Sequence, residues 1–427
     1  MRLDGRLVAM IVLGACVVVA CNAIVGVEDV RLRADRSARD DGGSSSGGED
    51  DDDDDDGTPL EDAGPTAPPV PLLALGSNHT CALMPDGTVR CWGAARLGQL
   101  GDGADLDAGT NPPDSPRPKV VPGIDDAVSI AAGANHTCVV RRDGRLTCWG
   151  FNYSGQLGIP SYRASSTPFD VPNVGGVVAV AGGTTATCVV LTDKTASCWG
   201  GNDYGQLGDG TKTSSPSPVK VKDLSGVTAI AIGSLHACAI VDPGDVYCWG
   251  ENSRGQLGNG TTTASLVPQK VGGATEAVEI ATAASFTCAR QRSGRVLCWG
   301  TNDAGQLGNG VTSTTPNPSP ILVASLVDAT QISTGLQHAC AVRATGEIGC
   351  WGEGAYGQLG SGRDAGSPVL DPVASMKDAR FVGGGGFRSC AVRDGGQAMC
   401  WGNNVSGELG DGTTTRSHLP VAVVDFP

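Results

Sequence analysis

The sequence predicts an all-β protein, a seven-bladed β-propeller made of four-stranded antiparallel blades. The tripeptide Cys-Trp-Gly occurs seven times, at intervals of 50 to 57 residues, and uses all seven tryptophans of the chain. A second cysteine lies ten residues before each tripeptide. The 64 glycines and 25 prolines among 427 residues exclude long helices. Repeats of about 50 residues with four strands each are typical of propeller blades.

The four strands of one repeat can be located around Cys238 and Cys248. Two short apolar runs flank a Pro-Gly turn between these cysteines, which predicts a β-hairpin. The apolar segment 227–233 predicts a third strand before the hairpin, and the segment 218–221 predicts a fourth. We expect the same arrangement in every repeat.

The paired cysteines predict disulfides. Counting outward from each turn places the two cysteines of a hairpin opposite each other, at a separation that a disulfide bridges. Packed free thiols are the alternative, because a buried Cys is also a good small hydrophobe. Zinc is disfavoured, since one hairpin supplies only two ligands. The expected pairs are Cys81–Cys91, Cys138–Cys148, Cys188–Cys198, Cys238–Cys248, Cys288–Cys298, Cys340–Cys350 and Cys390–Cys400.

A glycine-rich loop follows each Trp-Gly. It has the form Asn-x-x-Gly-Gln-Leu-Gly-Asp/Asn-Gly, and is intact at residues 202–210, 252–260 and 302–310. Together with the His-Thr-Cys-Ala-Leu strand and the Asp-Gly turn, this motif resembles the regulator of chromosome condensation repeat. The resemblance covers about residues 72–427 and implies a seven-bladed propeller. The founding relative exchanges guanine nucleotide on the Ran GTPase through a wedge on one face, and the repeats here are too uniform to contain an obvious wedge.

The two ends of the repeat region together make close to one further repeat. The residues after Cys400 and those from Leu72 to Cys91 add up to nearly one period. We therefore expect the N- and C-terminal strands to close the ring, with residues 419–424 pairing beside residues 72–75. Such closure leaves no open sheet edge.

The N-terminus predicts export. A short basic start is followed by an apolar stretch at residues 7–20, the layout of a secretory signal. Cys16 and Cys21 each follow small residues in a way that resembles the bacterial lipobox. We prefer lipidation of Cys21 and a signal peptide over residues 1–21, because cleavage before Cys16 would leave a run of valines exposed. An uncleaved membrane anchor is the alternative. By the same resemblance, Asn22 implies an outer-membrane or cell-surface location.

Residues 22–71 predict a disordered tether before a propeller over residues 72–427. The tether is rich in Gly, Ser, Asp and Pro, and residues 49–56 form an unbroken acidic run. A calcium site is disfavoured there, because the run lacks the turn-forming glycine and spaced ligands of a calcium loop. The rest of the chain is nearly balanced in charge and contains no basic block, so nucleic acid is not an expected partner.

No catalytic or cofactor motif stands out in the repeats. The repeats contain no Gly-x-Ser-x-Gly elbow, His-Glu-x-x-His or Walker-type loop, so we expect neither an enzyme nor a cofactor. Four of the five histidines occupy one repeated place, two residues before the first cysteine, and we interpret them as structural loop residues. A metal-binding ring around the axis is disfavoured because the other three repeats lack histidine there. The four are His79, His136, His236 and His338.

These observations favour a membrane-tethered, monomeric binding module for a protein or a glycan. The alternatives are a nucleotide-exchange regulator, by family analogy, and an enzyme inhibitor, by analogy with secreted propellers of this repeat type that inhibit β-lactamase. The best candidates for partner contacts are aromatic or Arg side chains in or near connecting loops, because such residues dominate interface energy. They are Tyr153, Tyr162, Arg163, Phe169, Tyr204, Arg254 and Tyr356.

Overall fold

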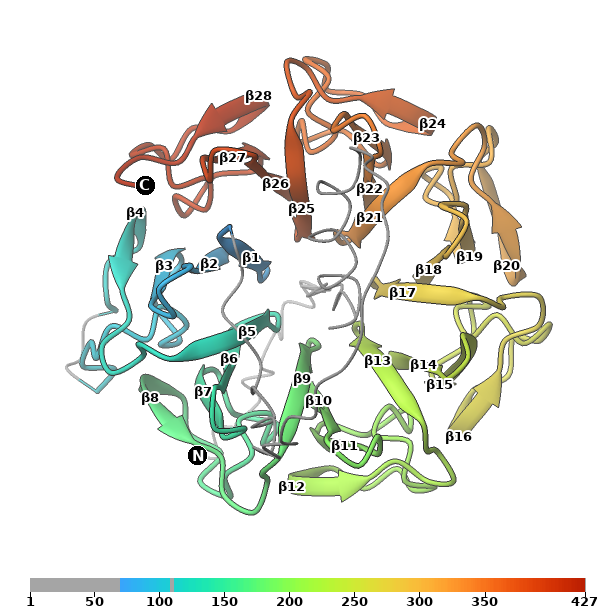
Figure 1. The fold of residues 1–427 in the computed structure, drawn as a ribbon. Coiled ribbons are helices and arrows are strands. Elements are labelled where there is room, and N and C mark those ends of the chain that lie inside the picture. Colours follow the sequence, from blue (N-terminus) through green and yellow to red (C-terminus); the bar gives the residue numbers. More distant parts are fainter. Residues whose placement is uncertain (1–69, 108–110, 427) are drawn as a thin grey trace, which may run out of the picture.

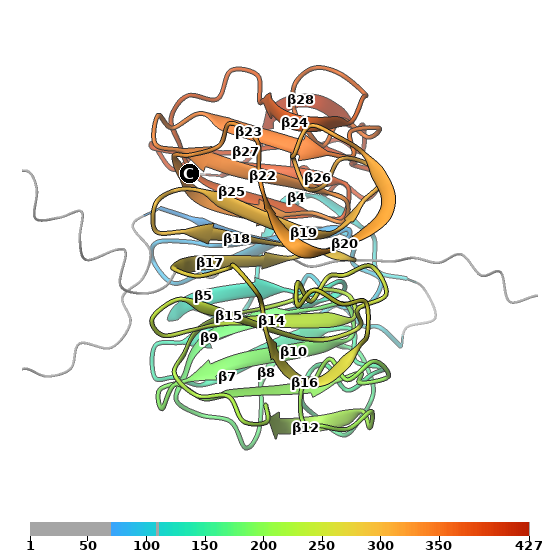
Figure 2. The ribbon, with the colours of Figure 1, turned by 90° about the vertical axis from the view of Figure 1, so that its right-hand side faces the viewer.

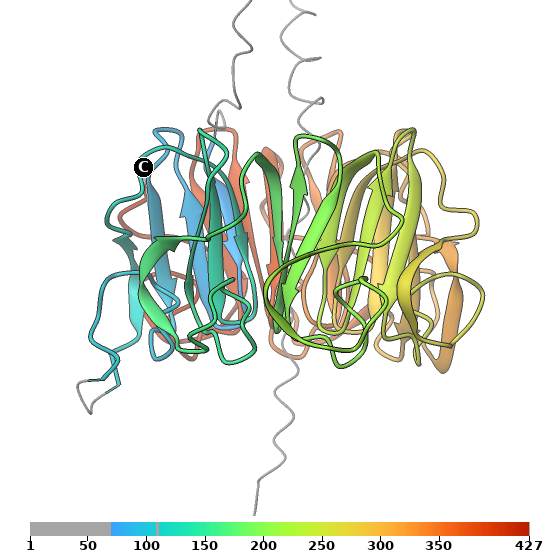
Figure 3. The same ribbon diagram turned by 90° about the horizontal axis from the view of Figure 1, so that it is seen from below.

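The computed structural model describes residues 70–107 and 111–426, and every regular element in these ranges is a β-strand. Twenty-eight strands form seven four-stranded antiparallel sheets, arranged as blades around a central axis (Figure 1). Side views show the blades standing next to one another as a disc (Figures 2 and 3). The predicted seven-bladed propeller is confirmed.

Each blade runs in chain order from the axis to the rim. The innermost strands are β1 (Leu72–Leu75), β5 (Ala127–Ala132), β9 (Val177–Gly182), β13 (Val227–Ile232), β17 (Ala277–Thr282), β21 (Ala329–Thr334) and β25 (Ala379–Gly385). The second strands are β2 (His79–Leu83), β6 (His136–Arg141), β10 (Ala186–Leu191), β14 (His236–Val241), β18 (Phe286–Gln291), β22 (His338–Arg343) and β26 (Arg388–Arg393). The third strands are β3 (Val89–Gly93), β7 (Leu146–Gly150), β11 (Ala196–Gly200), β15 (Asp245–Gly250), β19 (Val296–Asn302), β23 (Ile348–Gly352) and β27 (Ala398–Gly402). The outermost strands are β4 (Ser115–Val120), β8 (Ser165–Asp170), β12 (Ser215–Lys220), β16 (Ser265–Lys270), β20 (Ser313–Leu322), β24 (Ser367–Pro372) and β28 (Ser417–Ala422).

The antiparallel order gives the disc two different faces. The loops from first to second strand and from third to fourth strand lie on one side, which we call the loop face. The hairpin turns from second to third strand and the connections between blades lie on the other side, which we call the turn face. Because successive strands alternate in direction, this division holds in every blade.

The predicted cysteine pairs lie opposite each other in the central hairpins. Cys238 pairs in register with Cys248, and the same holds in the other six blades. All seven expected pairs are bonded as disulfides.

The repeated tryptophans hold neighbouring blades together. All seven are fully buried. Each indole Nε1 donates to the carbonyl of the glycine-rich loop in the preceding blade, as Trp249 does to Gln206 at 2.9 Å. The remaining bonds run from Trp149 to Gln99, Trp199 to Gln156, Trp299 to Gln256, Trp351 to Gln306, Trp401 to Gln358 and Trp92 to Glu408. The Trp-Gly and Gly-Gln-Leu-Gly motifs are therefore two halves of one contact between blades.

The last glycine of Gly-Gln-Leu-Gly is required by this contact. Gly208 has φ +70°, and a Cβ there would lie 2.6 Å from Nε1 of Trp249. A side chain would therefore meet both backbone strain and a clash with the indole.

Proline protects the outer edges of six blades. In each outermost strand one residue pairs with the second cysteine of the hairpin, as Val219 pairs with Cys198. In six blades the residue before it is proline, which has no N–H that could bond to another chain. The positions are Pro118, Pro168, Pro218, Pro268, Pro320 and Pro420, whereas β24 has Leu370.

The predicted pairing of the terminal strands is wrong. β1 pairs with β2 in the first blade and β28 pairs with β27 in the seventh, so the two terminal strands belong to different sheets. The prediction assigned the segment 218–221 to the following hairpin, but β12 pairs with β11 of the preceding one. Because the loop after each Trp-Gly returns the chain to its own hairpin, every blade is completed locally. Side chains of blades 7 and 1 close the ring in a shared buried cluster that includes Leu75, Trp92 and Val392.

The predictions for residues 1–21 and for most of residues 22–71, including Cys16 and Cys21, lie outside the described residues. In the part of the chain that the structure describes, no helix is long and apolar enough to cross a membrane.

Candidate functional site: the loop face

The long loops of the loop face are held by their own side chains. In blade 3, Oδ1 of Asn202 accepts from the N–H of Leu207 at 3.0 Å, and its Nδ2 donates to the carbonyl of Thr213 at 3.0 Å. Oε1 of Gln206 accepts from the N–H of Tyr204 at 3.0 Å. The Asn and Gln of the motif thus satisfy the loop backbone internally. The residues between them, such as Tyr204, are left at the exposed tip of the loop.

Each of these loops also begins against the shorter loop of its blade. The N–H of Phe151 donates to the carbonyl of Asn135 at 2.8 Å, and the N–H of Gly201 donates to the carbonyl of Thr185 at 2.8 Å. The loop face is therefore a fixed surface, continuous from the axis outward to the loop tips.

The predicted contact residues share this face but are spread around the ring. Six of the seven lie in loops between third and fourth strands, in blades 2, 3, 4 and 6: Tyr153, Tyr162, Arg163, Tyr204, Arg254 and Tyr356. All six are exposed. They form no single compact patch, because blades 2 and 6 lie on different sides of the axis (Figure 1).

Two of the predicted residues differ from the simple picture of a free loop side chain. Phe169 lies near the end of the outermost strand β8, next to the connection to blade 3, and is half-buried against the core of its blade, so it is not a free contact residue. Arg163 donates to the carboxylate of Asp107 at 3.1 Å, although both side chains remain largely exposed.

Aromatic pairs strengthen the face at two places. Phe151 and Tyr153 lie with ring centroids 4.7 Å apart in blade 2, and Tyr356 of blade 6 lies 4.7 Å from Phe387 of blade 7. Sequence reasoning missed Phe387. Its signal is that an aromatic side chain breaks the repeat in the short loop next to the axis, where other blades have small, polar or aliphatic residues.

The turn face has a different character. Arginines at the ends of second strands pair there with carboxylates in the connections between blades, as Arg343 does with Asp328 at 3.0 Å and Arg393 with Asp378 at 2.8 Å. The bond from Asp328 raises the pKa of Arg343. The fifth tyrosine, Tyr247, lies within β15, so the turn face of the described chain carries no tyrosine.

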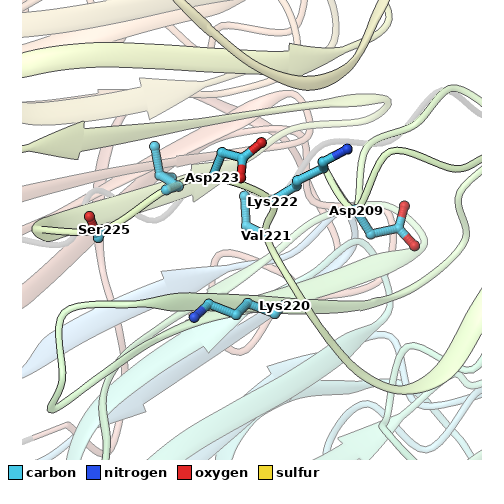
Figure 4. Close-up of a pocket in the computed structure, with 7 residues that line it drawn as sticks. Asp209, Lys220, Val221, Lys222, Asp223 and Ser225 are labelled. Carbon is cyan, nitrogen blue, oxygen red and sulfur yellow. The ribbon is translucent and has the colours of Figure 1, made fainter.

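A hollow of about 600 Å³ lies at the rim of blade 3 (Figure 4). It is formed by the end of β12 and the connection that follows, and two lysines and two aspartates give it mixed charge. Its lining residues are Asp209, Lys220, Val221, Lys222, Asp223, Leu224 and Ser225. Nothing in this arrangement converges on a single chemistry.

The four repeated histidines tie neighbouring blades together. They are the buried first residues of β2, β6, β14 and β22, so their prediction as loop residues is corrected to strand residues. Nε2 of His236 lies 2.8 Å from Oγ1 of Thr287 in the next blade, and that hydroxyl donates onward to the carbonyl of Gln256. The imidazole Nε2 therefore carries the proton in this contact. The equivalent partners are Thr137 for His79, Thr187 for His136 and Ser389 for His338.

Burial keeps these imidazoles neutral. It lowers the pKa of His136 to about 4 and that of the other three to about 3. Among residues 70–107 and 111–426, no three His, Cys, Asp or Glu side chains gather as a metal site.

The sequence matches established family models. Residues 42–278 match the model described as RCC1-like domain, and residues 293–342 and 329–358 match models described as regulator of chromosome condensation (RCC1) repeat. Human RCC1 domain-containing protein 1 is 36% identical over 91 residues, which cover 21% of this chain and 22% of that protein. The ultraviolet-B receptor UVR8 of Arabidopsis thaliana is 35% identical over 89 residues, 20% of this chain and 19% of that protein. The match thus spans about a fifth of the length of these relatives.

Solved structures share the fold over most of the chain. Human WBSCR16 superposes with a TM-score of 0.69 at 23% identity, covering 78% of this chain and 92% of that one. Prp20p of Saccharomyces cerevisiae superposes with a TM-score of 0.70 at 20% identity, covering 84% and 88%. These likenesses show the fold alone.

Proposed function

Because the chain belongs to the RCC1-like domain family, we propose that it is a binding module without catalysis of its own, whose loop face docks a protein partner. We further propose that its N-terminal segment holds it at the cell envelope. Proteins of this fold bind other proteins: yeast Prp20 binds Kap60 in a crystal structure, and binding properties to Gsp1p and histones are described for Prp20p.

The observation that carries the proposal is the unequal distribution of aromatic side chains. Four exposed tyrosines lie on the loop face and none lies on the turn face of the described chain. Tyr and Arg are the residues most often found at the energetic centre of protein interfaces. Arg254 makes no ion pair within the described residues, so its guanidinium is available to a partner. The loop face therefore offers exposed tyrosine anchors that the turn face of the described chain lacks.

The rigidity of the loops supports the same conclusion. The amide contacts of Asn202 and Gln206 fix the loop before any partner arrives. A surface that is already ordered loses less conformational entropy on association. A protein partner would typically cover about 1,200–2,000 Å² in total, which is enough to engage several adjacent blades.

Envelope attachment rests on the N-terminal sequence and is compatible with the position at which the described residues begin. Pro71 lies against Gly396 in the hairpin turn of blade 7, on the turn face. A tether that enters there leaves the loop face free for a partner. The seven disulfides fit an oxidising compartment.

Substitution of the two N-terminal cysteines tests the attachment. Cys21→Ser should abolish lipid labelling and release the protein from membranes, whereas Cys16→Ser should leave both unchanged. Metabolic labelling with a fatty acid and fractionation measure the outcome. The opposite pattern would move the lipidated residue to Cys16, and retention of both variants in the membrane would contradict the lipid anchor.

Site-specific photocrosslinking tests the docking face. A photoreactive residue placed at Tyr153 or Tyr204 in the full chain should give a defined adduct in cells, and one placed at Arg142 or Arg292 of the turn face should not. Tyr153→Ala, in the blade adjacent to the probe at Tyr204, should reduce the adduct formed from that probe. Adducts from the turn face alone, protection by free glycans, or sustained nucleotide exchange or hydrolysis by the pure protein would overturn the proposal.

A further inference from the structure

The contact between blade 7 and blade 1 differs from the other six contacts between blades. Six pairs of neighbouring blades are joined by a short stretch of chain, such as residues 171–176 between blades 2 and 3. No chain joins blade 7 to blade 1, and no strand is shared between them. We call this contact the closing seam. It is the only one of the seven that can separate without stretching the backbone.

Arg388 occupies the closing seam at the position where four other blades have histidine. It is the first residue of β26 and is 1% exposed. Its guanidinium donates to the carbonyl of Ser77 at 2.6 Å, to the carbonyl of His79, and to Oγ1 of Thr80 at 3.0 Å. One side chain of blade 7 therefore holds a loop carbonyl, a strand carbonyl and a hydroxyl of blade 1.

The equivalent histidines hold much less. Nε2 of His236 contacts one hydroxyl of the next blade, that of Thr287. Thr80 occupies the position of Thr287 in blade 1, so a histidine at position 388 would find the same single partner. Arginine retains that hydroxyl contact and adds hydrogen bonds to two backbone carbonyls. At this position the closing seam therefore has more hydrogen bonds between blades than the contacts made by histidine.

A second exchange in blade 7 accompanies the arginine. Glu408 replaces the repeated glutamine, is fully buried, and its carbonyl accepts from the indole of Trp92 at 2.9 Å and from Thr80 at 3.0 Å. Its carboxylate accepts from the side chain of Asn78 in blade 1 at 3.3 Å. Burial lowers the pKa of Arg388 to about 10, and the negative charge of Glu408 acts in the opposite direction. The two exchanges bring a buried cation and a buried anion to one seam.

We propose that the ring opens at the closing seam and that Arg388 is the latch that keeps it shut. Covalent connections resist separation of the other six pairs of blades, whereas only side-chain packing and hydrogen bonds resist it here. Removing the contacts of a buried cation is costly, so the hydrogen bonds of Arg388 to three acceptors of blade 1 hold the first and last blades together. Glu408 supports the latch by compensating its charge.

Hydrogen–deuterium exchange of the full chain tests the latch. Arg388→His introduces the residue that four other repeats have and should keep one contact to Thr80. It should raise exchange about tenfold in β1, β2, β26 and β27 and leave β13 to β15 unchanged. His236→Ala is the matched control at the covalently joined contact between blades 4 and 5, because blade 3 already has Ala186 in that place. It should not accelerate exchange at the closing seam.

Two further measurements keep the test decisive if Arg388→His folds poorly. Glu408→Gln removes the charge while leaving the carbonyl that binds Trp92, and should raise exchange in the same four strands. In the wild-type protein, low concentrations of urea should expose the amides of β1 and β26 before those of β13 and β14. Uniform acceleration across all blades, or first opening elsewhere in the ring, would overturn the proposal.

Discussion

The buried histidines show how a single side chain contributes to the joining of blades. Nε2 of each imidazole lies within hydrogen-bond distance of a hydroxyl of the next blade, and each ring lies out of water. Its pKa in the folded chain, about 3 to 4, lies below the ordinary value of 6.5. Between these values the unfolded chain binds protons that the folded chain does not, so the free energy of unfolding falls as the pH falls through this window.

A histidine substitution should therefore reduce the acid sensitivity of the protein. We expect the urea midpoint to fall between pH 6.5 and pH 4.5, and the fall to be smaller in His236→Ala than in the wild type. The measurement is urea unfolding followed by circular dichroism at both pH values. His418→Ala, at an exposed histidine, is the control. An equal fall in His236→Ala and the wild type would show that the buried imidazole does not resist protonation.

Two glycines of one loop allow the cost of a steric clash to be measured separately from the cost of backbone strain. Gly258 has φ +67°, and a Cβ there would lie 2.7 Å from Nε1 of Trp299. Gly260 has φ +80°, and a Cβ there would meet nothing within 4 Å. We expect Gly258→Ala to lower the free energy of unfolding by about 3 kcal/mol and Gly260→Ala by only about 1 kcal/mol. Thermal or urea unfolding measures both, and equal losses would mean that the indole contact adds nothing to backbone strain.

At the level of the blade, blade 6 has a larger residue at one position of its outermost strand and a smaller residue at the neighbouring position of its third strand. Leu370 replaces the repeated proline of β24, and Gly349 stands beside it where other blades have a larger residue before the second cysteine. A Cβ at Gly349 would lie 2.4 Å from Cγ of Leu370. The leucine therefore fills the space that the glycine leaves.

A double-mutant cycle tests this compensation. Gly349→Thr alone should lower stability by about 1–3 kcal/mol, because the new side chain overlaps Leu370. Adding Leu370→Pro removes the overlap and restores the pattern of the other blades, so the double variant should recover most of the loss. Urea unfolding of the two single variants and the double variant measures the coupling. Losses that simply add would show that the two positions do not share space.

The hairpins could be predicted from the sequence because their signal is local. The ten-residue cysteine spacing around a Pro/Asp-Gly turn fixes the register of Cys238 with Cys248, and the structure has that register. The outermost strands were assigned to the wrong hairpin, because a polar, proline-rich strand such as β12 carries no hydrophobic alternation that shows which neighbour it pairs with. That error alone produced the incorrect pairing of the terminal strands.

At the level of the whole molecule, repetition predicts the ring but does not predict its binding face. Spacing gives seven blades, and the loop position of Tyr204 and Tyr356 follows from the repeat. That both project from the same face follows only once the strand order is known. The roles of Phe387 and Arg388 depend on contacts between residues of different blades, which a single sequence does not display.

The whole molecule thus has one face rich in exposed aromatic anchors and one face of paired charges. The proposed docking on the loop face predicts that binding energy is unequally divided between these faces. Loss of two tyrosine anchors should weaken binding strongly, because each such anchor contributes about 1–2 kcal/mol or more at an interface. Loss of exposed charges on the turn face should change it little.

The most direct test is the affinity of the crosslinked partner for paired variants of the full chain. We expect Tyr153→Ala/Tyr204→Ala, in adjacent blades 2 and 3, to weaken binding at least about tenfold, and Arg142→Ala/Arg292→Ala on the turn face to leave it within about twofold, with unchanged melting curves for both. Isothermal titration calorimetry gives the two dissociation constants. Full binding by the tyrosine variant together with loss of binding by the arginine variant would contradict docking on the loop face.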